Sequence, residues 1–266
     1  MLTLGLTGGI GTGKTSLARL LERHGAKVLY LDDVARLVLA PGTQATAEVA
    51  RLWPDVVKDG AIDRKALGQI VFSDERALQR LNAIVHPRTW QAELCQLAAW
   101  QSQGVPVALV ELALLASSER QWGFHANLVV DAPLPARLDR LERDRAMSSQ
   151  EASARIASQR PREEVLAIAD FVVDNSGSQR ELEAAARSAW QEWIAPFAAN
   201  LTAGRRLHGL DVPPSDDQRH RARQRLEHQG ATSGGPRDPA AFARAGFVPG
   251  QGEDYVSADP MFRMKV

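Results

Sequence analysis

The sequence predicts an α/β fold, a doubly wound parallel sheet of five strands with helices on both faces. Two observations predict it. Short and nearly continuous apolar runs alternate with stretches of helical pattern, as expected of parallel strands that are covered on both sides. A glycine-rich segment joins the first apolar run to the first helical stretch, which makes a strand–loop–helix unit. The expected strands are residues 2–6, 27–31, 105–112, 128–131 and 171–173.

Residues 8–15, GGIGTGKT, fit the phosphate-loop pattern G-x-x-x-x-G-K-[ST] of P-loop NTPases. Glycines let backbone N–H groups turn toward phosphate oxygens, and the N-terminus of the following helix adds partial positive charge. We expect Lys14 to reach the β- and γ-phosphates and the Thr15 hydroxyl to bind Mg²⁺. A plain glycine turn with a surface lysine is the simpler alternative, which the flanking strand and helix disfavour. The expected nucleotide contacts are Gly8, Gly9, Ile10, Gly11, Thr12, Gly13, Lys14, Thr15 and Ser16.

The composition argues against several other classes of protein. Lys and Arg total 32 and balance 32 Asp and Glu, so no overall basic field points to nucleic acid or to a membrane surface. The single cysteine, Cys95, cannot form an internal disulfide, and no Cys/His cluster has metal-ligand spacing. The most apolar stretch, 105–116, contains Glu111 and is too short to span a bilayer. We expect a cytoplasmic protein without a signal peptide, because the N-terminus is itself a strand and a loop.

A helical pattern occupies about 70 residues after the second expected strand, which is too long for an ordinary crossover. Breaks at Pro41-Gly42, Asp59-Gly60 and His86-Pro87 divide it. We interpret residues 33–90 mainly as a helical insertion packed beside the sheet. One expected helix in this region begins at residue 34. The others occupy residues 45–53, 64–72, 75–85 and 89–103.

Two arginine-rich helices are expected after the fourth strand, at 135–145 and 149–160, and a closing helix at 180–199. Residues 201–266 differ in composition, with Pro213-Pro214, Gly234-Gly235-Pro236 and few large apolar residues. We therefore expect one domain over 1–200 and a mostly disordered C-terminal extension over 201–266. Contact of its Arg/His run at 219–225 with RNA or acidic surfaces is a less favoured alternative.

Several separate segments between residue 1 and about 197 carry motifs: 6–15 (LTGGIGTGKT), 32–36 (DDVAR), 41–42 (PG), 59–64 (DGAIDR), 71–72 (VF), 81–87 (LNAIVHP), 155–159 (RIASQ) and 169–177 (ADFVVDNSG). Together they resemble the motifs of the dephospho-CoA kinases. The glycine loop is generic to a superfamily, whereas DGxLDR, LNxIxHP and ADxVIDNxG in this order are specific. The chain departs from the family where Tyr30 replaces an acid and where Ala113 and Ser117 replace Pro and Glu. The resemblance implies that the helical insertion at 33–90 binds the substrate and that about 135–162 is an arginine-bearing lid.

The resemblance implies transfer of the γ-phosphoryl group of ATP to the 3′-hydroxyl of dephospho-CoA, with Mg²⁺, giving coenzyme A and ADP. It implies catalytic roles for Lys14, Asp32 and Arg140. Asp32 follows the second expected strand, where a carboxylate can orient the attacking hydroxyl or accept its proton. Its alternative is a helix cap, the role that we favour for Asp33.

The remaining candidates implied by the resemblance are ligand contacts. Arg140 and Arg143 in the lid are expected to contact ATP, and Asn175 to edge the adenine pocket. Arg64 and His86 are expected to bind the acceptor, together with Asp32. A solvated helix face is the alternative for each arginine, a simple turn for Asn175, and a structural role for His86.

Two other functions stay open from the sequence. The departures at Tyr30, Ala113 and Ser117 also fit a related small-molecule or nucleotide kinase with another acceptor. An ATP-binding regulatory protein is the third interpretation, which intact Lys14 and Asp32 disfavour. In the favoured interpretation the partner is the small molecule dephospho-CoA, not a nucleic acid or a membrane. The sequence does not decide the oligomeric state, for which a monomer is the default expectation.

Overall fold

The computed structural model of the chain describes residues 1–113, 115–117, 119–231, 238–250 and 254–264. They form two compact units, Met1–Val28 with Gly104–Val266, and Leu29–Gln103. The first unit contains most of the sheet, and the second is mainly helical. No helix in the described part of the chain combines the length and apolarity that crossing a membrane requires.

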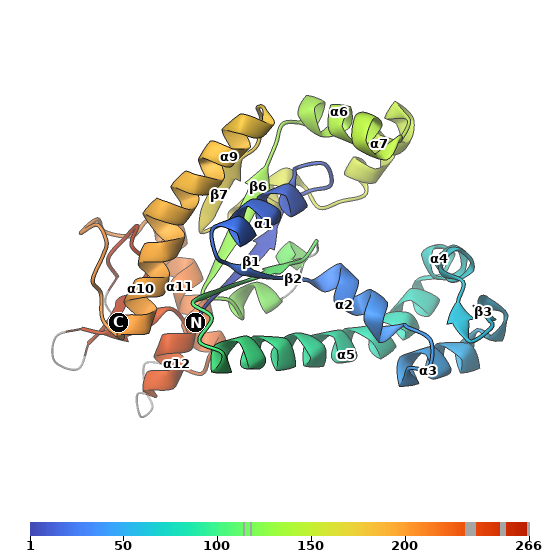
Figure 1. Cartoon of the computed structure of the whole chain (residues 1–266), viewed down its shortest axis with the longest axis horizontal. Coiled ribbons are helices and arrows are strands. Elements are labelled where there is room, and N and C mark those ends of the chain that lie inside the picture. The colour runs from blue at the N-terminus through green and yellow to red at the C-terminus, as the bar shows by residue number, and fades with distance from the viewer. Residues whose placement is uncertain (114, 118, 232–237, 251–253, 265–266) are drawn as a thin grey trace. The chain divides into compact units, whose positions relative to one another are not determined.

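The predicted five-stranded parallel sheet is confirmed, in the order β2-β5-β1-β6-β7 (Figure 1). Strand β1 is central, with β5 on one side and β6 on the other, so the chain changes direction across the sheet at β1. The loop after β1 therefore opens at a topological switch point, where sheets of this kind bind ligands. The strands are β1 (Leu2–Thr7), β2 (Lys27–Tyr30), β5 (Val107–Glu111), β6 (Ala126–Asp131) and β7 (Phe171–Asp174).

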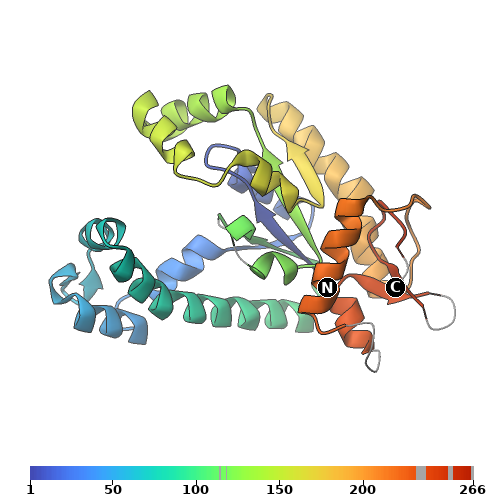
Figure 2. The same ribbon diagram turned by 180° about the vertical axis from the view of Figure 1, so that it is seen from behind.

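Helices cover both faces of this sheet, as the alternation of apolar runs predicts. Helices α1 (Lys14–Arg23) and α9 (Gln179–Ser188) lie toward the viewer in Figure 1, and α8 (Arg162–Ala167) lies toward the viewer in Figure 2. Helix α1 buries Leu17 and Leu21 completely. A π-helical turn, Ala189–Ile194, joins α9 to α10 (Ala195–Ala203), and its Trp193 is also fully buried.

The lid region consists of α6 (Leu134–Arg145), α7 (Ser149–Ala157) and the short α8. A capping box between Ser148 and Glu151 starts α7, and α6 packs against α7. The sequence predicted the first two helices. It did not predict α8, because six residues are too few for a clear helical period.

The second unit contains the predicted helices, with two differences. Helix α5 (Glu75–Ser102) runs unbroken through His86-Pro87, where two helices were expected. The Arg88 and Thr89 side chains donate hydrogen bonds to Ile84 O and Val85 O beside the proline, and Ile84 is buried, so packing outweighs the proline penalty. The other elements are α2 (Leu31–Val38), α3 (Gln44–Leu52), α4 (Arg64–Ser73) and a hairpin of β3 (Val57–Lys58) and β4 (Ala61–Ile62).

Helix α2 is the second difference, because it begins at Leu31 rather than at residue 34. Tyr30 has extended backbone angles and occupies the N-cap position, so the cap role expected of Asp33 is not realised. Asp33 instead pairs with Arg36 at 2.5 Å, and both side chains are exposed. Acidic residues in a first helical turn interact favourably with the helix dipole, which explains why the helix extends over Asp32 and Asp33.

The C-terminal extension differs from the mostly disordered segment that was expected. It contains α11 (Asp216–His228), α12 (Pro239–Arg244) and an antiparallel pair, β8 (Phe247–Pro249) with β9 (Tyr255–Ser257). A separate apolar cluster holds these elements together, with Phe242 stacked on Tyr255 at 4.0 Å between ring centroids. The apolar residues are few, but they converge, and composition alone cannot show that.

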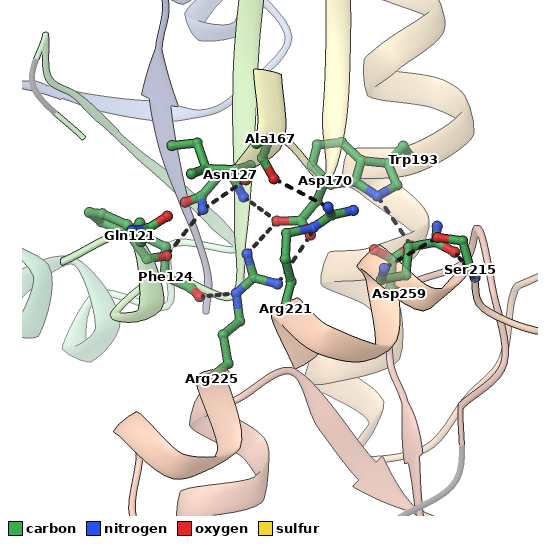
Figure 3. Close-up of polar contacts among 12 residues, drawn as sticks. Gln121, Phe124, Asn127, Ala167, Asp170, Trp193, Ser215, Arg221, Arg225 and Asp259 are labelled. Atoms are coloured by element: carbon green, nitrogen blue, oxygen red, sulfur yellow. Dashed lines mark hydrogen bonds and ion pairs between the residues drawn. The ribbon is translucent and has the colours of Figure 1, made fainter. Parts of the chain in front are cut away.

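The extension docks through a buried carboxylate, Asp170, which lies just before β7 (Figure 3). Asp170 Oδ1 accepts hydrogen bonds from Arg221 Nε at 3.0 Å and Arg225 Nη1 at 3.1 Å, and Oδ2 accepts from the Asn127 amide at 2.7 Å. Arg225 Nε also donates to Phe124 O at 3.1 Å. These partners lie just before or at the start of β6 and β7. Helix α11 therefore braces the amino ends of these strands, and the glycine loop lies at the opposite, carboxyl ends (Figures 1 and 2).

Candidate active site

The glycine loop lies between β1 and α1, and its backbone requires glycine. Gly8, Gly11 and Gly13 have φ angles of 152°, 78° and 96°. A Cβ atom on Gly8 would lie 2.3 Å from Val130 O, and one on Gly13 would lie 2.3 Å from Asn175 Nδ2. Gly13 is also the N-cap of α1 and gives the helix no side-chain cap. The loop and the helix start therefore form a cradle suited to an anion.

Lys14 lies along this loop. Its Nζ donates hydrogen bonds to Gly8 O at 3.0 Å and Gly9 O at 3.3 Å. The loop is also tied internally, because Thr12 Oγ1 donates to Gly9 O at 2.9 Å. The predicted cation and the predicted cradle thus come together in one place, where the ammonium group can balance phosphate charge.

Glu111, which was not among the predicted site residues, lies beside Thr15 in the structure. Glu111 is the last residue of β5, in register with Leu6 at the end of β1. Thr15 Oγ1 donates to both carboxylate oxygens of Glu111 at 3.3 Å. The hydroxyl and the carboxylate together offer three oxygen atoms at one point, and oxygen is the ligand type that Mg²⁺ prefers. An acid at the end of the strand next to the glycine loop was the available signal.

Arg140 and Asn175 also meet at the loop. Asn175 is buried, and its Nδ2 donates to Thr12 O at 2.7 Å. Arg140 Nη2 donates to Asn175 O at 2.7 Å and Gly177 O at 3.2 Å, and its Nη1 reaches Gly11 O at 3.4 Å. Two predicted side chains from the lid and from the segment after β7 therefore converge on the glycine loop.

Arg143, the other predicted lid arginine, has different surroundings. Its side chain is 62% exposed and pairs with Asp139 and Asp144, both at 2.8 Å. Asn175 contacts both Arg140 and the glycine loop, whereas the ion pairs of Arg143 are with these two acids of its own helix. The expected contact of Arg143 with ATP stays a prediction.

A cavity of about 310 Å³ lies directly beside the glycine loop. Gly8, Gly9 and Thr12 form one wall, and the end of β6 with α8 supplies apolar atoms. The polar lining combines three arginines with one carboxylate: Arg137, Arg160, Arg162 and Asp131. Ala113 also lines it, so the alanine at this departure from the family motif faces the same space. The cavity is suited to a ligand with apolar and anionic parts.

The second unit contains the other predicted residues. Asp32 is exposed in the first turn of α2, directly after β2. Arg64 Nη2 reaches Arg36 O at 3.5 Å, and both arginines line a hollow of about 500 Å³ with apolar atoms of Leu37 and Ile62. The unit therefore presents a mixed cationic and apolar surface around Arg64.

His86 lies apart from that hollow's lining, on the exposed side of α5. Its ring contacts that of Trp90, with 5.6 Å between the centroids. Among the described residues, no group of three His, Cys, Asp or Glu side chains forms a metal site.

One curated relative reaches beyond the kinase fold. The dephospho-CoA kinase of Mycolicibacterium paratuberculosis (strain ATCC BAA-968 / K-10) is 37% identical over 241 residues, 89% of this chain and 58% of that protein. A match of that length includes part of the C-terminal extension. The extension is thus shared, at least in part, with a longer relative.

Other comparisons concern the kinase fold itself. The dephospho-CoA kinase of Thermobifida fusca (strain YX) is 42% identical over 194 residues, 72% of this chain and 96% of that protein. The solved structure of dephospho-CoA kinase from Campylobacter jejuni matches with a TM-score of 0.57 and 25% identity, over 71% of this chain and 96% of that one. A family model described as dephospho-CoA kinase matches residues 2–181, more than half of the sequence. With this glycine loop and this sheet order, the chain belongs to the dephospho-CoA kinase family.

Proposed function

We propose that this kinase transfers the γ-phosphoryl group of ATP to the 3′-hydroxyl of dephospho-CoA, which yields coenzyme A and ADP. The observation that carries the proposal is the glycine loop with Lys14, Arg140 and Asn175 around it, in a member of this family. Phosphoryl transfer needs mainly positioning and charge stabilisation from a protein, and these residues supply both.

In this reaction the bond from the 3′-oxygen to the γ-phosphorus forms, and the bond from that phosphorus to the β–γ bridging oxygen breaks. The proton of the hydroxyl passes to the carboxylate of Asp32, or Asp32 orients the hydroxyl during attack. Lys14 balances charge on the transferred group and on the ADP that leaves. Arg140, which already bonds to Gly11 O, adds a second positive charge on the lid side.

Thr15 and Glu111 fit a magnesium ion, because their oxygen atoms face each other at 3.3 Å beside the loop. We propose that these two side chains hold Mg²⁺ together with phosphate oxygens of ATP, as this small cation prefers one or two protein ligands. Bound there, the ion would neutralise phosphate charge.

The hollow around Arg64 supports an acceptor that carries both phosphate and apolar parts. Arg36 and Arg64 can pair with a diphosphate, and Leu37 and Ile62 can contact an alkyl-amide arm. We propose that dephospho-CoA binds there, with His86 as a further contact. A monomer in the cytoplasm is part of the proposal, and the exposed single Cys95 suits a reducing compartment.

The test is ADP release with ATP, Mg²⁺ and dephospho-CoA, compared with a panel of other alcohols and nucleotides. We expect dephospho-CoA to be the best acceptor, and a clearly better one would contradict the substrate assignment. Asp32→Asn should lower kcat on the order of 10²-fold with little change in ATP binding. Asp55→Asn, an exposed acid of the same unit, is the control. Near-normal turnover of Asp32→Asn would remove Asp32 from the mechanism.

A further inference from the structure

The backbone N–H and C=O groups of Ile10, in the glycine loop, are both hydrogen-bonded to side chains of the lid region. The Ile10 amide donates to Gln159 Oε1 at 2.8 Å, and Arg137 Nε donates to Ile10 O at 2.8 Å. Arg137 Nη2 donates to the same Gln159 Oε1 at 3.1 Å, which closes a triangle of hydrogen bonds. We call these contacts among Ile10, Arg137 and Gln159 the Ile10 clasp.

The charge of Arg137 is held in this clasp at an energetic cost. Its side chain is buried, and burial lowers the pKa of the guanidinium. The acid that opposes this effect is Asp131, which is already bonded to Arg162 at 2.5 Å. Arg137 itself forms no ion pair with any residue that the structure describes. The guanidinium also lines the cavity beside the glycine loop, where an anionic ligand would balance its charge.

The loop sequence accommodates this arginine at Gly9. A Cβ atom on Gly9 would lie 2.6 Å from Arg137 Nη2, and Gly9 lacks the positive φ of its neighbours Gly8 and Gly11. Glycine at position 9 is therefore explained by the guanidinium that covers it rather than by its own backbone conformation.

The clasp also belongs to a series of contacts that orients the loop. Three consecutive carbonyls, of Ile10, Gly11 and Thr12, accept hydrogen bonds from Arg137, Arg140 and Asn175 in turn. In a trans peptide the carbonyl of one residue and the N–H of the next point in opposite directions, and no peptide bond described here is cis. Holding the Ile10 and Thr12 carbonyls on one side therefore directs the Gly11 and Gly13 amides to the opposite side, whereas the Thr12 amide donates to Gly9 O at 3.3 Å within the loop.

We propose that Arg137 and Gln159 are positioning residues, whose clasp on Ile10 holds the loop amides in the orientation that binds the ATP phosphates. Arg137 and Arg140 are three residues apart on α6, so one helix face fixes two successive carbonyls of the loop. The inference rests on the proposed ATP site at this loop. In this inference Arg137 is the second lid arginine at the glycine loop, beside Arg140, a place that the sequence had suggested for Arg143.

The test measures the Kd for ATP with Mg²⁺ in the absence of acceptor, together with kcat, KM and Tm. Arg137→Met and Gln159→Met should each weaken ATP binding about tenfold, since each removes hydrogen bonds that orient the loop. The double variant should be about as weak as either single variant, because both remove the same clasp. Arg137→Lys, which keeps one donor, should be intermediate. Arg145→Met and Gln150→Met, exposed on α6 and α7, are controls and should stay within about twofold.

Several results would overturn the inference. In the double variant a loss near 100-fold would show two independent contacts instead of one clasp. If ATP affinity is unchanged and the KM for dephospho-CoA is raised, both residues only line the adjacent cavity and do not position the loop. If Arg137→Met lowers Tm so far that it does not fold, Gln159→Met and Arg137→Lys decide the question alone.

Lys14→Ala separates the clasp from the proposed ATP site. We expect it to abolish ATP binding. If ATP still binds to Lys14→Ala, the assignment of the loop as the ATP site fails. If Lys14→Ala loses ATP while the clasp variants bind normally, only the clasp fails.

Discussion

Two titratable side chains, the half-buried His125 and the buried Asp259, lie where the C-terminal extension meets the start of the sheet. The Thr3 amide donates to His125 Nδ1 at 3.0 Å, and His125 Nε2 lies 3.1 Å from Ala243 O, so the neutral ring donates there. Asp259 Oδ1 accepts from Trp193 Nε1 at 3.3 Å and from the Met261 amide at 2.9 Å (Figure 3). Burial lowers the pKa of His125 to about 4 and raises the pKa of Asp259 to about 6.

The Asp259 pKa predicts a pH-dependent stability difference. Its carboxyl binds a proton more tightly in the folded state than in the unfolded state, where the pKa is 3.8. The free energy of unfolding therefore decreases as pH rises from about 4 to about 6, on the order of 3 kcal/mol in total. Asp259→Asn lacks this decrease. Urea unfolding at several pH values should show the variant gaining stability relative to the wild type across that window.

His125 contributes with the opposite sign, which is why the difference between two proteins is measured. Because the pKa of His125 is lowered in the folded state, its contribution to the free energy of unfolding is fully present above about pH 6.5. That contribution is lost as pH falls toward 4. The two slopes oppose each other between about pH 4 and 6, so the wild-type curve alone is not diagnostic. A variant-minus-wild-type difference that stays constant with pH would contradict the assigned burial of the Asp259 carboxyl.

The glycine loop illustrates what single residues reveal before a structure is known. That the glycines, Lys14 and Thr15 lie together was predictable, because they are neighbours in the sequence and their spacing carries the geometry. Glu111 and Arg137 were not, because they join the loop through β5 and α6. An arginine among many others gives no local sign that its guanidinium will be buried.

Helix α11 acts as a brace because two of its arginines share the buried carboxylate of Asp170. We expect Arg225→Met to lower the free energy of unfolding by about 2–3 kcal/mol, since it leaves a buried carboxylate less compensated. Arg221 and the Asn127 amide remain, which is why the loss should not be larger. Urea unfolding is the measurement. Arg219→Met on the same helix, whose partner Asp216 is exposed, should change stability by less than about 0.5 kcal/mol.

Equal stability of the Arg225→Met and Arg219→Met variants would contradict the brace. It would mean that α11 is held by its apolar face alone, through residues such as Leu226 and Ala222. That apolar contribution can be tested separately with Leu226→Ala, which should also destabilise the extension.

At the level of elements, the sequence predicted the strands and the main helices because their periods are local. It divided α5 at His86-Pro87, where a helix with one packed face continues through a proline that would end an isolated helix. It also interpreted the extension as mostly disordered. Residues such as Phe242, Phe247 and Phe262 are spread over a polar segment, and only the fold brings them into one cluster.

At the scale of the whole molecule, the extension and the glycine loop belong to the first unit and lie at opposite ends of the strands of one sheet (Figure 1). The Thermobifida fusca relative is matched over 96% of its length by 194 residues, so almost all of that protein corresponds to the kinase fold of this chain. The extension of this chain nevertheless contributes polar partners to that fold. Asn200 in α10 is fully buried and donates to His208 O and Ala258 O, which only the extension provides.

Truncation after residue 204 should therefore separate stability from activity. We expect Tm to fall by several degrees or more, because the truncation removes the hydrogen-bond partners of the Asn200 side chain and both arginine partners of Asp170, and exposes Phe197. The kcat per folded molecule should change by less than about threefold, since the loop, Lys14 and Arg140 keep their contacts within residues 1–204. Differential scanning calorimetry gives Tm, and ADP release normalised to bound ATP gives kcat. A truncated protein that stays folded and binds ATP, yet loses turnover, would show that the extension acts on the reaction itself.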